Sequence, residues 1–233
     1  MRTDLGAYQE TTSTEAFALQ NPRLLRVRLQ EGAIRAKSGS MVAYQGDVAF
    51  EYVSGGVGKF LKKAVTGEGQ RLMNMSGTGE VFLADTAKKI HLLYLENESL
   101  TVNGDALLAI DDDIEWDIQR VKGGAAGMMA GGLFNTTLQG TGYVALLTDG
   151  DPVLLDVTQA PTFADAQAAV AWSGQVTTTF KTDIKAFKTL TGRSSGESLQ
   201  IGFGGTGWVL VQPSEGPPFP PAGGGGGAGG LFS

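Results

Sequence analysis

The tripeptide Gly-Thr-Gly occurs three times in this chain at almost constant spacing. The copies stand at 77–79, 140–142 and 205–207, separated by 63 and 65 residues, and each leads into an apolar segment. Self-similarity at a fixed period is typical of a repeat architecture. We therefore expect three tandem copies of one structural unit.

A second pattern recurs with nearly the same period. Four mostly apolar residues are followed, after an identical gap, by three mostly apolar residues on alternate positions. The occurrences are Met41-Val42-Ala43-Tyr44 with Val48, Phe50 and Tyr52; Leu107-Leu108-Ala109-Ile110 with Ile114, Trp116 and Ile118; and Ala169-Val170-Ala171-Trp172 with Val176, Thr178 and Phe180. Alternation with a period of two predicts strands that have one face in the core and the other in water. The predicted fold class is all-β.

A further strand candidate precedes these motifs, at 24–29, 90–95 and 153–157 in the three copies. In the first of them apolar residues alternate with Arg26 and Arg28, which this pattern places in water. We expect the C-terminal strand, at about 199–212, to pair with the N-terminal repeat. That pairing closes three tandem β repeats into a pseudo-threefold barrel or prism with few open edges. The repeated glycines are predicted to serve tight turns or bulges, or close backbone approach between units.

The composition predicts one folded domain and a tail. Hydrophobic residues make up 42% of the chain, which is enough for a buried core. Residues 1–212 are predicted to form a single triplicated β domain. Beyond it, prolines and then a glycine run from 223 to 227 predict a disordered tail over 213–233.

Composition also excludes several classes of function. The chain has no cysteine, so it has no disulfide framework, thiolate zinc site or reactive thiol. No secretory leader and no run of eighteen apolar residues occurs, so we expect a soluble, cytoplasmic protein. The net charge of −6 makes nucleic acid an unfavourable partner.

The apparent catalytic motifs lack the context that their chemistry needs. The Gly-x-Ser-x-Gly pattern at 192–196 has no downstream histidine, because the single histidine of the chain is His91. The dinucleotide-like glycines at 202–207 run into a strand instead of opening a helix. The acidic run at 111–117 alternates with apolar residues and is explained by a solvated strand face. We therefore expect no enzyme, no catalytic residues, no cofactor and no metal site.

One surface is unusual in its charge. Each copy carries an insert before its Gly-Thr-Gly strand, at 54–71, 120–132 and 181–198, and together these inserts have a charge of +7 against −13 for the remainder. They also hold apolar residues. The predicted docking surface is formed by Lys59, Phe60, Lys62, Lys63, Lys122, Met128, Met129, Lys185, Phe187 and Lys188. Lysine beside apolar side chains suits an anionic membrane surface or an acidic protein partner.

These features favour a non-enzymatic scaffold or adaptor, peripheral at the inner face of a membrane where it binds lipid. Alternatives stay open at this point. The apolar insert residues are also compatible with capping the barrel core, and a small-molecule or enzymatic site between repeats is the main alternative function. Nucleic-acid binding by the basic end is a third, weaker alternative. A homo-oligomer is compatible with the sequence, which does not set its number.

The motifs together resemble a known family. The segment 38–46, Ser-Gly-Ser-Met-Val-Ala-Tyr-Gln-Gly, is followed by Lys62-Lys63, by 66–68 (Thr-Gly-Glu) and by the Gly-Thr-Gly of 77–79. This arrangement resembles the mitochondrial biogenesis family named for altered inheritance of mitochondria, over about Leu24 to Val211. The resemblance implies a triplicated β fold similar to the tryptophan RNA-binding attenuator protein, and relatives associated with the mitochondrial inner membrane. It supplies no catalytic residues, and the attenuator's tryptophan and RNA binding do not transfer with the fold.

Overall fold

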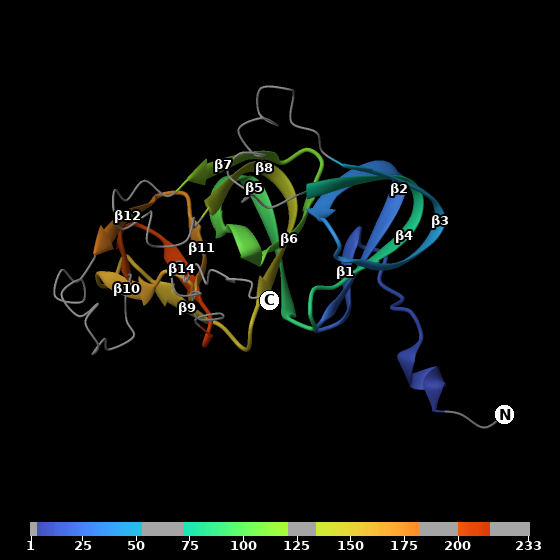
Figure 1. Ribbon diagram of the computed structural model, residues 1–233, viewed down its shortest axis with the longest axis horizontal. Coiled ribbons are helices and arrows are strands. Elements are labelled where there is room, and N and C mark those ends of the chain that lie inside the picture. The colour runs from blue at the N-terminus through green and yellow to red at the C-terminus, as the bar shows by residue number, and fades with distance from the viewer. Residues whose placement is uncertain (1–3, 53–71, 121–133, 182–199, 215–233) are drawn as a thin grey trace, which may run out of the picture.

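The computed structural model describes residues 4–52, 72–120, 134–181 and 200–214. These residues form three groups of strands that lie side by side in a row (Figure 1). The first group is η1 (Leu5–Tyr8), β1 (Phe17–Asn21), β2 (Leu24–Lys37), β3 (Met41–Tyr52) and β4 (Leu72–Leu83). The second is β5 (Lys89–Asn103), η2 (Gly104–Ala106), β6 (Leu107–Asp111), β7 (Glu115–Arg120) and β8 (Phe134–Thr148). The third is β9 (Val153–Asp156), β10 (Thr162–Asp165), β11 (Ala169–Ser173), β12 (Val176–Lys181), β13 (Gln200–Gly205) and β14 (Trp208–Val211). The predicted all-β class is confirmed.

Within each group the last strand lies between strands that precede it in the chain. β4 pairs with β2 and β3, and β8 pairs with β5 on one side and with β6 and β7 on the other. In the third group the last strand is divided, so that β13 pairs with β10 and β12, and β14 pairs with β9 and β11. All of these pairs are antiparallel, so the three groups share one pairing pattern.

Two short pairings join the groups. Residues 34–36 of β2 pair with 109–111 of β6, and residues 100–102 of β5 pair with 171–173 of β11. The resulting large sheet has the order β3-β4-β2-β6-β8-β5-β11-β14-β9, and a smaller sheet has the order β10-β13-β12. Three buried clusters of apolar side chains fill the row, one for each group.

The glycines of the repeated motif are required by the backbone. All six Gly positions of the three motifs have positive φ, for example +127° at Gly77, +133° at Gly140 and +136° at Gly207. A Cβ on Gly77 would lie 2.3 Å from the Asp47 carbonyl oxygen of the neighbouring strand. Because of the positive φ and this close approach, any residue other than glycine would be energetically costly at this position. Close backbone approach is confirmed, but at Gly77 it joins two strands of one group and not two units as expected.

The expected closure of the sheet is not confirmed, and the expected pairing of the C-terminal strand is wrong. Among the described strands, β3 and β9 form the two ends of the large sheet. β13 and β14 pair with strands of their own group and not with the N-terminal group. The physical reason is that the third group supplies its own first strand, in two pieces. Only the 153–157 piece is evident in the sequence. The predicted domain limits stay a prediction, and the tail beyond Ser214 lies outside the described residues.

We predict that Gly77→Ala destabilises the protein by about 1–3 kcal/mol, because the new Cβ meets the Asp47 carbonyl and the backbone must leave its positive φ. Gly32→Ala is the matched control, since a Cβ there has nothing within 4 Å. Its free energy of unfolding should change by less than about 0.5 kcal/mol. Urea unfolding followed by circular dichroism measures both. Equal stability of the two variants would contradict the assigned role of Gly77.

Candidate functional site

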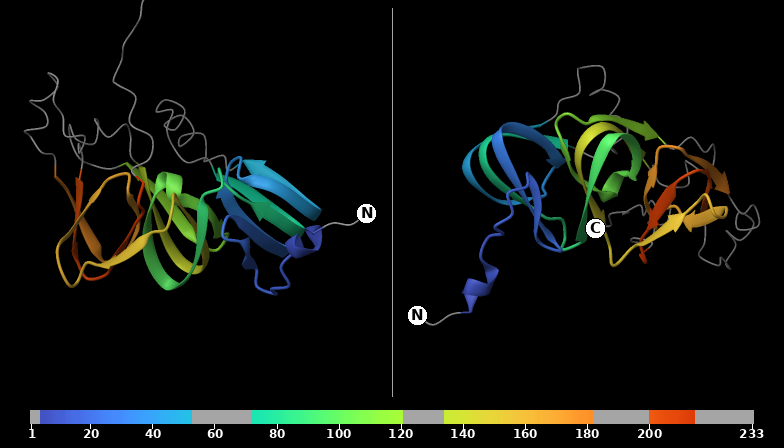
Figure 2. Two further views of the ribbon diagram at one scale, coloured as in Figure 1. Left: turned by 90° about the horizontal axis from the view of Figure 1, so that it is seen from below. Right: turned by 180° about the vertical axis from the view of Figure 1, so that it is seen from behind.

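All ten residues of the predicted docking surface lie outside the described residues, in the ranges 53–71, 121–133 and 182–199. The strand ends that flank these ranges are described. They are paired residues at corresponding hairpin ends: Tyr52 lies opposite Met73, Arg120 opposite Phe134, and Lys181 opposite Gln200. The left view of Figure 2 shows that the described hairpin ends of all three groups lie on the same side of the row. We call this side the hairpin face.

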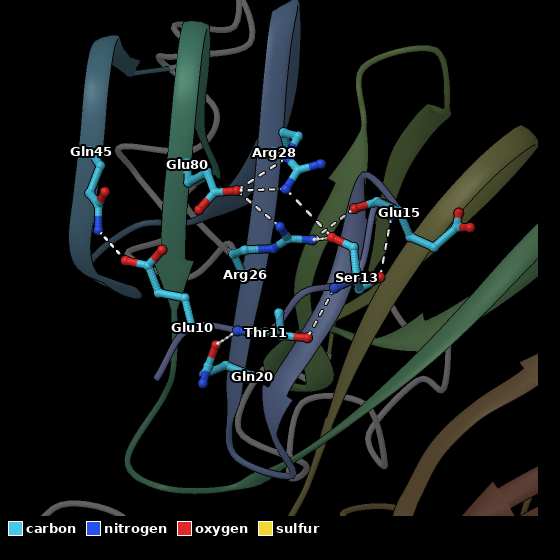
Figure 3. Close-up of polar contacts among 9 residues, drawn as sticks. All are labelled: Glu10, Thr11, Ser13, Glu15, Gln20, Arg26, Arg28, Gln45 and Glu80. Carbon is cyan, nitrogen blue, oxygen red and sulfur yellow. Dashed lines mark hydrogen bonds and ion pairs between the residues drawn. The ribbon is translucent and has the colours of Figure 1, made fainter. Parts of the chain in front are cut away.

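A buried arginine on β2 binds the N-terminal segment to the outer surface of the first group (Figure 3). Arg26 on β2 is 0% exposed. Its Nη1 donates to Glu80 Oε1 at 2.9 Å, and its Nη2 donates to the carbonyl oxygens of Ser13 and Glu15, both at 3.0 Å. The expectation that Arg26 lies in water is therefore wrong. The chain before β2 covers this face of the strand, which alternation along β2 alone does not reveal.

The Glu80 carboxylate also accepts a hydrogen bond from a second arginine. Arg28 Nε donates to Glu80 Oε1 at 3.1 Å, so Oε1 of Glu80 accepts from two guanidinium groups. The N-terminal segment is held further by Gln20, whose side chain accepts from the Thr11 amide at 2.7 Å and donates to the Gln9 carbonyl at 2.8 Å. Figure 3 shows this segment crossing the face formed by β2, β4 and β3. We call residues 9–16 the N-terminal strap.

The strap also contacts the second group. Tyr143 on β8 donates its hydroxyl hydrogen to Glu15 Oε2 at 2.9 Å, and this hydrogen bond raises the pKa of Tyr143. Phe17, which follows the strap, stacks on Tyr143 with ring centroids 5.2 Å apart, and Tyr94 meets the same ring edge-on at 4.9 Å. The strap therefore links the first two groups. The sequence signal that could have revealed it is the pair of arginines on one strand face with a glutamate on the neighbouring strand.

We predict that Glu80→Ala lowers the free energy of unfolding by about 3–5 kcal/mol, because it leaves the buried Arg26 guanidinium without its carboxylate. Glu10→Ala removes an exposed carboxylate from the same strap, where it accepts from Gln45. It should change the free energy by less than about 0.5 kcal/mol. Chemical denaturation measures the free energy of unfolding of both variants. A loss below about 1 kcal/mol for Glu80→Ala contradicts a central role for the ion pair.

The acidic run contains a structural carboxylate. Asp111 Oδ2 accepts from the Tyr143 amide at 2.6 Å, directly after the second Gly-Thr-Gly motif, and burial raises the pKa of Asp111. Ser173 has the same position in the third group, and its Oγ accepts from the Trp208 amide at 3.1 Å. Within 111–118, the exposed Asp113, Glu115 and Asp117 alternate with better-buried Ile114, Trp116 and Ile118, as a solvated strand face requires.

This chain is similar to known proteins in its sequence and in its fold. The family model described as mitochondrial biogenesis AIM24 matches residues 17–214. The chain belongs to the AIM24 family. The expected resemblance is thereby confirmed. Among solved structures, the crystal structure of protein SPYM3_0169 from Streptococcus pyogenes is similar, with a TM-score of 0.68 and 23% identity. That similarity covers 84% of this chain and 91% of the Streptococcus chain, and at this identity it shows the fold alone. A comparison with curated proteins found no match.

Two further observations concern this AIM24-family chain. Across the described residues there is no cluster of three or more His, Asp or Glu side chains suited to a metal ion. No helix within the described ranges is long and apolar enough to span a membrane.

His91 of the AIM24-family chain has structural partners. Its Nε2 lies 2.8 Å from Thr148 Oγ1, and that hydroxyl donates to the Gly150 carbonyl at 2.7 Å. The hydroxyl hydrogen is thus in use, so Nε2 donates. Burial lowers the pKa of His91 below its usual value of 6.5. The charge of Asp151 partly opposes this shift, and the charge of Lys89 adds to it.

This shift predicts a pH dependence of stability. On acidification the unfolded chain takes up a proton at His91 near pH 6.5, whereas the folded chain does so only at lower pH. The free energy of unfolding therefore falls as the pH drops from about 7 toward the folded pKa, and the loss ends below it. His91→Gln should abolish this part of the pH profile. Urea unfolding of both proteins between about pH 7.5 and pH 5 measures it. Parallel profiles would falsify the assignment.

Proposed function

We propose that this AIM24-family protein is a non-enzymatic scaffold that docks with its hairpin face on an anionic membrane surface. The observation that carries the proposal is the common side of the three hairpin ends (Figure 2). The basic inserts begin and end at these hairpins, so one side of the row receives all three attachment points. The family description, mitochondrial biogenesis, is compatible with a role at a membrane.

Charge supports this orientation. The inserts carry +7 and the remainder of the chain −13. A basic residue near an anionic leaflet contributes about 1 kcal/mol, and this attraction falls off within about 10 Å at 0.1 M salt. Lysines next to the surface are therefore attracted, while acidic groups further from it are screened. The apolar insert residues, including Phe60 and Met128, add burial in the interfacial region.

The non-enzymatic part of the proposal rests on what the reactive groups do. His91 is engaged with Thr148, and Asp111 with the amide that follows a glycine motif. The glycines at 202–207 belong to β13 and the turn before β14, where they allow close strand packing. A small-molecule site between repeats stays a prediction that no observation favours.

The test is flotation of the purified protein with anionic and neutral liposomes at low and high salt. We expect binding to anionic vesicles at low salt, reduced at high salt, and lost when Lys59, Lys62, Lys63, Lys185 and Lys188 are all changed to glutamate. A matched pair of double variants isolates the surface. Lys62→Glu with Lys63→Glu should weaken flotation. Arg23→Glu with Lys88→Glu should leave it unchanged, because these residues flank the opposite strand ends, where Leu25 pairs with Leu83.

Failure of the wild-type protein to float under every condition refutes membrane docking. Retention of a purified acidic protein on the same face, lost in the five-lysine variant, then identifies the surface as a protein-binding one. Equal weakening by the two double variants shows that net charge alone governs binding, which also contradicts a docking face.

A further inference from the structure

The strands β3, β6 and β11 hold equivalent positions in the three groups. Between Met41 and Ala43 the register of β3 against β4 shifts by one residue, and β6 and β11 show the same shift within 107–109 and 169–171. In all three cases the opposite residues stand three and four positions after the last glycine of the Gly-Thr-Gly motif. Residues 43–45 of β3 are therefore the structural equivalents of 109–111 and 171–173.

Two of these equivalent segments pair with a further strand on their outer side. Residues 109–111 of β6 lie antiparallel to 34–36 of β2, and residues 171–173 of β11 lie antiparallel to 100–102 of β5. The register is the same in both junctions, since the first residue of each segment lies opposite the third residue of the incoming strand. Among the described strands, residues 43–45 have no such partner, because β3 is one end of the large sheet. The first group therefore presents an edge that the other two groups use for pairing.

Without a partner strand, apolar side chains of β3 lie in water. Val42 is 58% exposed, whereas its equivalents Leu108 and Val170 are 0% and 1% exposed. Tyr44 is 49% exposed, whereas its equivalents in the other two groups are buried. All residues from 42 to 47 are exposed, and Figure 1 shows β3 at one end of the row. Because these positions are buried wherever an outer strand is present, their exposure marks the place of a further strand.

The two ends of the large sheet differ in how they are protected. β9, at one end, is four residues long, follows Asp151 and Pro152, and ends in Asp156. Short length, charge and proline are the usual means by which natural proteins keep an edge strand from pairing. β3, at the other end, is twelve residues long, and its segment 41–46 contains no charged residue and no proline. The β3 edge is thus suited to accept a strand, whereas the β9 edge is protected.

The internal junctions show which kind of strand fits this edge. The incoming segments are Ile34-Arg35-Ala36 and Leu100-Thr101-Val102, each with an apolar residue at both ends and a polar residue in the middle. The four apolar side chains are at most 3% exposed. Both segments are already paired within the chain, and the corresponding third-group segment, Thr162-Phe163-Ala164, has the polar residue first and the large apolar one in the middle. The fitting occupant is therefore a segment of a different protein and not a second copy of this chain.

We propose that residues 43–45 of β3 bind an extended segment of a partner protein by strand addition. The segment reads large apolar, polar, then small or β-branched apolar, and it runs antiparallel to β3. Its first residue lies opposite Gln45, its second opposite Tyr44 and its third opposite Ala43, in the register of the two internal junctions. Main-chain hydrogen bonds supply the affinity of such complexes, and pockets for alternate side chains supply the specificity. The bound segment covers Val42 and Tyr44, as the incoming strands cover their equivalents.

Disulfide cross-linking to a synthetic peptide tests the register, because the chain contains no cysteine. Opposite residues of an antiparallel pair have Cα atoms about 4.5–5.5 Å apart, which suits a disulfide. The probe is a peptide of residues 32–38 with the change Ala36→Cys. In a glutathione buffer, Ala43→Cys protein should link to it about tenfold more than to the same peptide with Arg35→Cys, whose cysteine points to the other face. Ala49→Cys protein is the control, since Ala49 is exposed on the same strand outside the paired segment.

Two results of the cross-linking contradict the proposal. Equal yields with the two peptides show that the peptide has no fixed register on β3. Equal yields with the Ala43→Cys and Ala49→Cys proteins show that segment 43–45 is not the place of binding. Intact-mass measurement before and after reduction gives all four yields.

Fluorescence anisotropy with labelled peptides of residues 32–38 and 98–104 tests affinity. The first peptide is basic and the second acidic, so binding of both is not a charge effect. Val42→Lys should weaken binding of both peptides about tenfold, because it places a charge where the equivalent side chains are buried. Ala49→Lys should bind like the wild type, and the 98–104 peptide with Leu100→Asp should not bind. All protein variants should retain the wild-type circular dichroism spectrum.

The remaining outcomes also decide the proposal. A wild-type protein that binds neither peptide at about 1 mM overturns it, and so does equal binding by the Val42→Lys and Ala49→Lys proteins. A wild-type dimer in sedimentation that is lost in Val42→Lys assigns the β3 edge to a second copy, which overturns the choice of a different protein. None of these measurements uses liposomes, so strand addition and membrane docking fail separately.

Discussion

At each junction of the row, a short β segment of one group supplies apolar side chains to the core of the group before it. Leu108 and Ala109 enter the first cluster, and Val170 and Ala171 enter the second. A single repeat unit cannot bury its hydrophobic face alone, which is the general reason why repeat units stack. The backbone pairings at 34–36 and 100–102 fix the register of this exchange. The cores of the first and second groups therefore depend on the group that follows each of them.

In the first group, the N-terminal strap covers part of the outer surface of β2. Arg26 on β2 is buried because residues 13–16 and β1 cover it, and its charge is balanced by Glu80. The positions equivalent to Glu80 after the other glycine motifs are Tyr143 and Trp208, which have no carboxylate. A buried guanidinium is costly unless it is paired and hydrogen-bonded, so this arrangement ties the strap to one place on one group. The strap then reaches Tyr143 of the second group through Glu15.

The sequence predicted those features that depend on local geometry. The glycine motif needs positive φ and close backbone approach, and both follow from the residue itself. The alternation of acidic and apolar residues over 113–118 predicted which face of this segment is exposed. The predicted position of Arg26 was wrong because the cover over β2 comes from the preceding segment, which has no apolar period of its own. The pairing of the C-terminal strand was wrong because β10, Thr162–Asp165, has almost no strand pattern, so the third group seemed to lack a partner strand. The ten predicted docking residues fall outside the described ranges.

The hairpin face and the junctions use different directions of the same row. The strands run between the hairpin face and the opposite side, whereas the junctions join groups along the row (Figure 2). A row built with one junction geometry keeps its hairpin ends on one side, so all three inserts begin and end there. In the proposed docking, three linked basic segments therefore reach one anionic surface together. Linked sites convert later binding events into intramolecular ones, which raises overall affinity without any new contact.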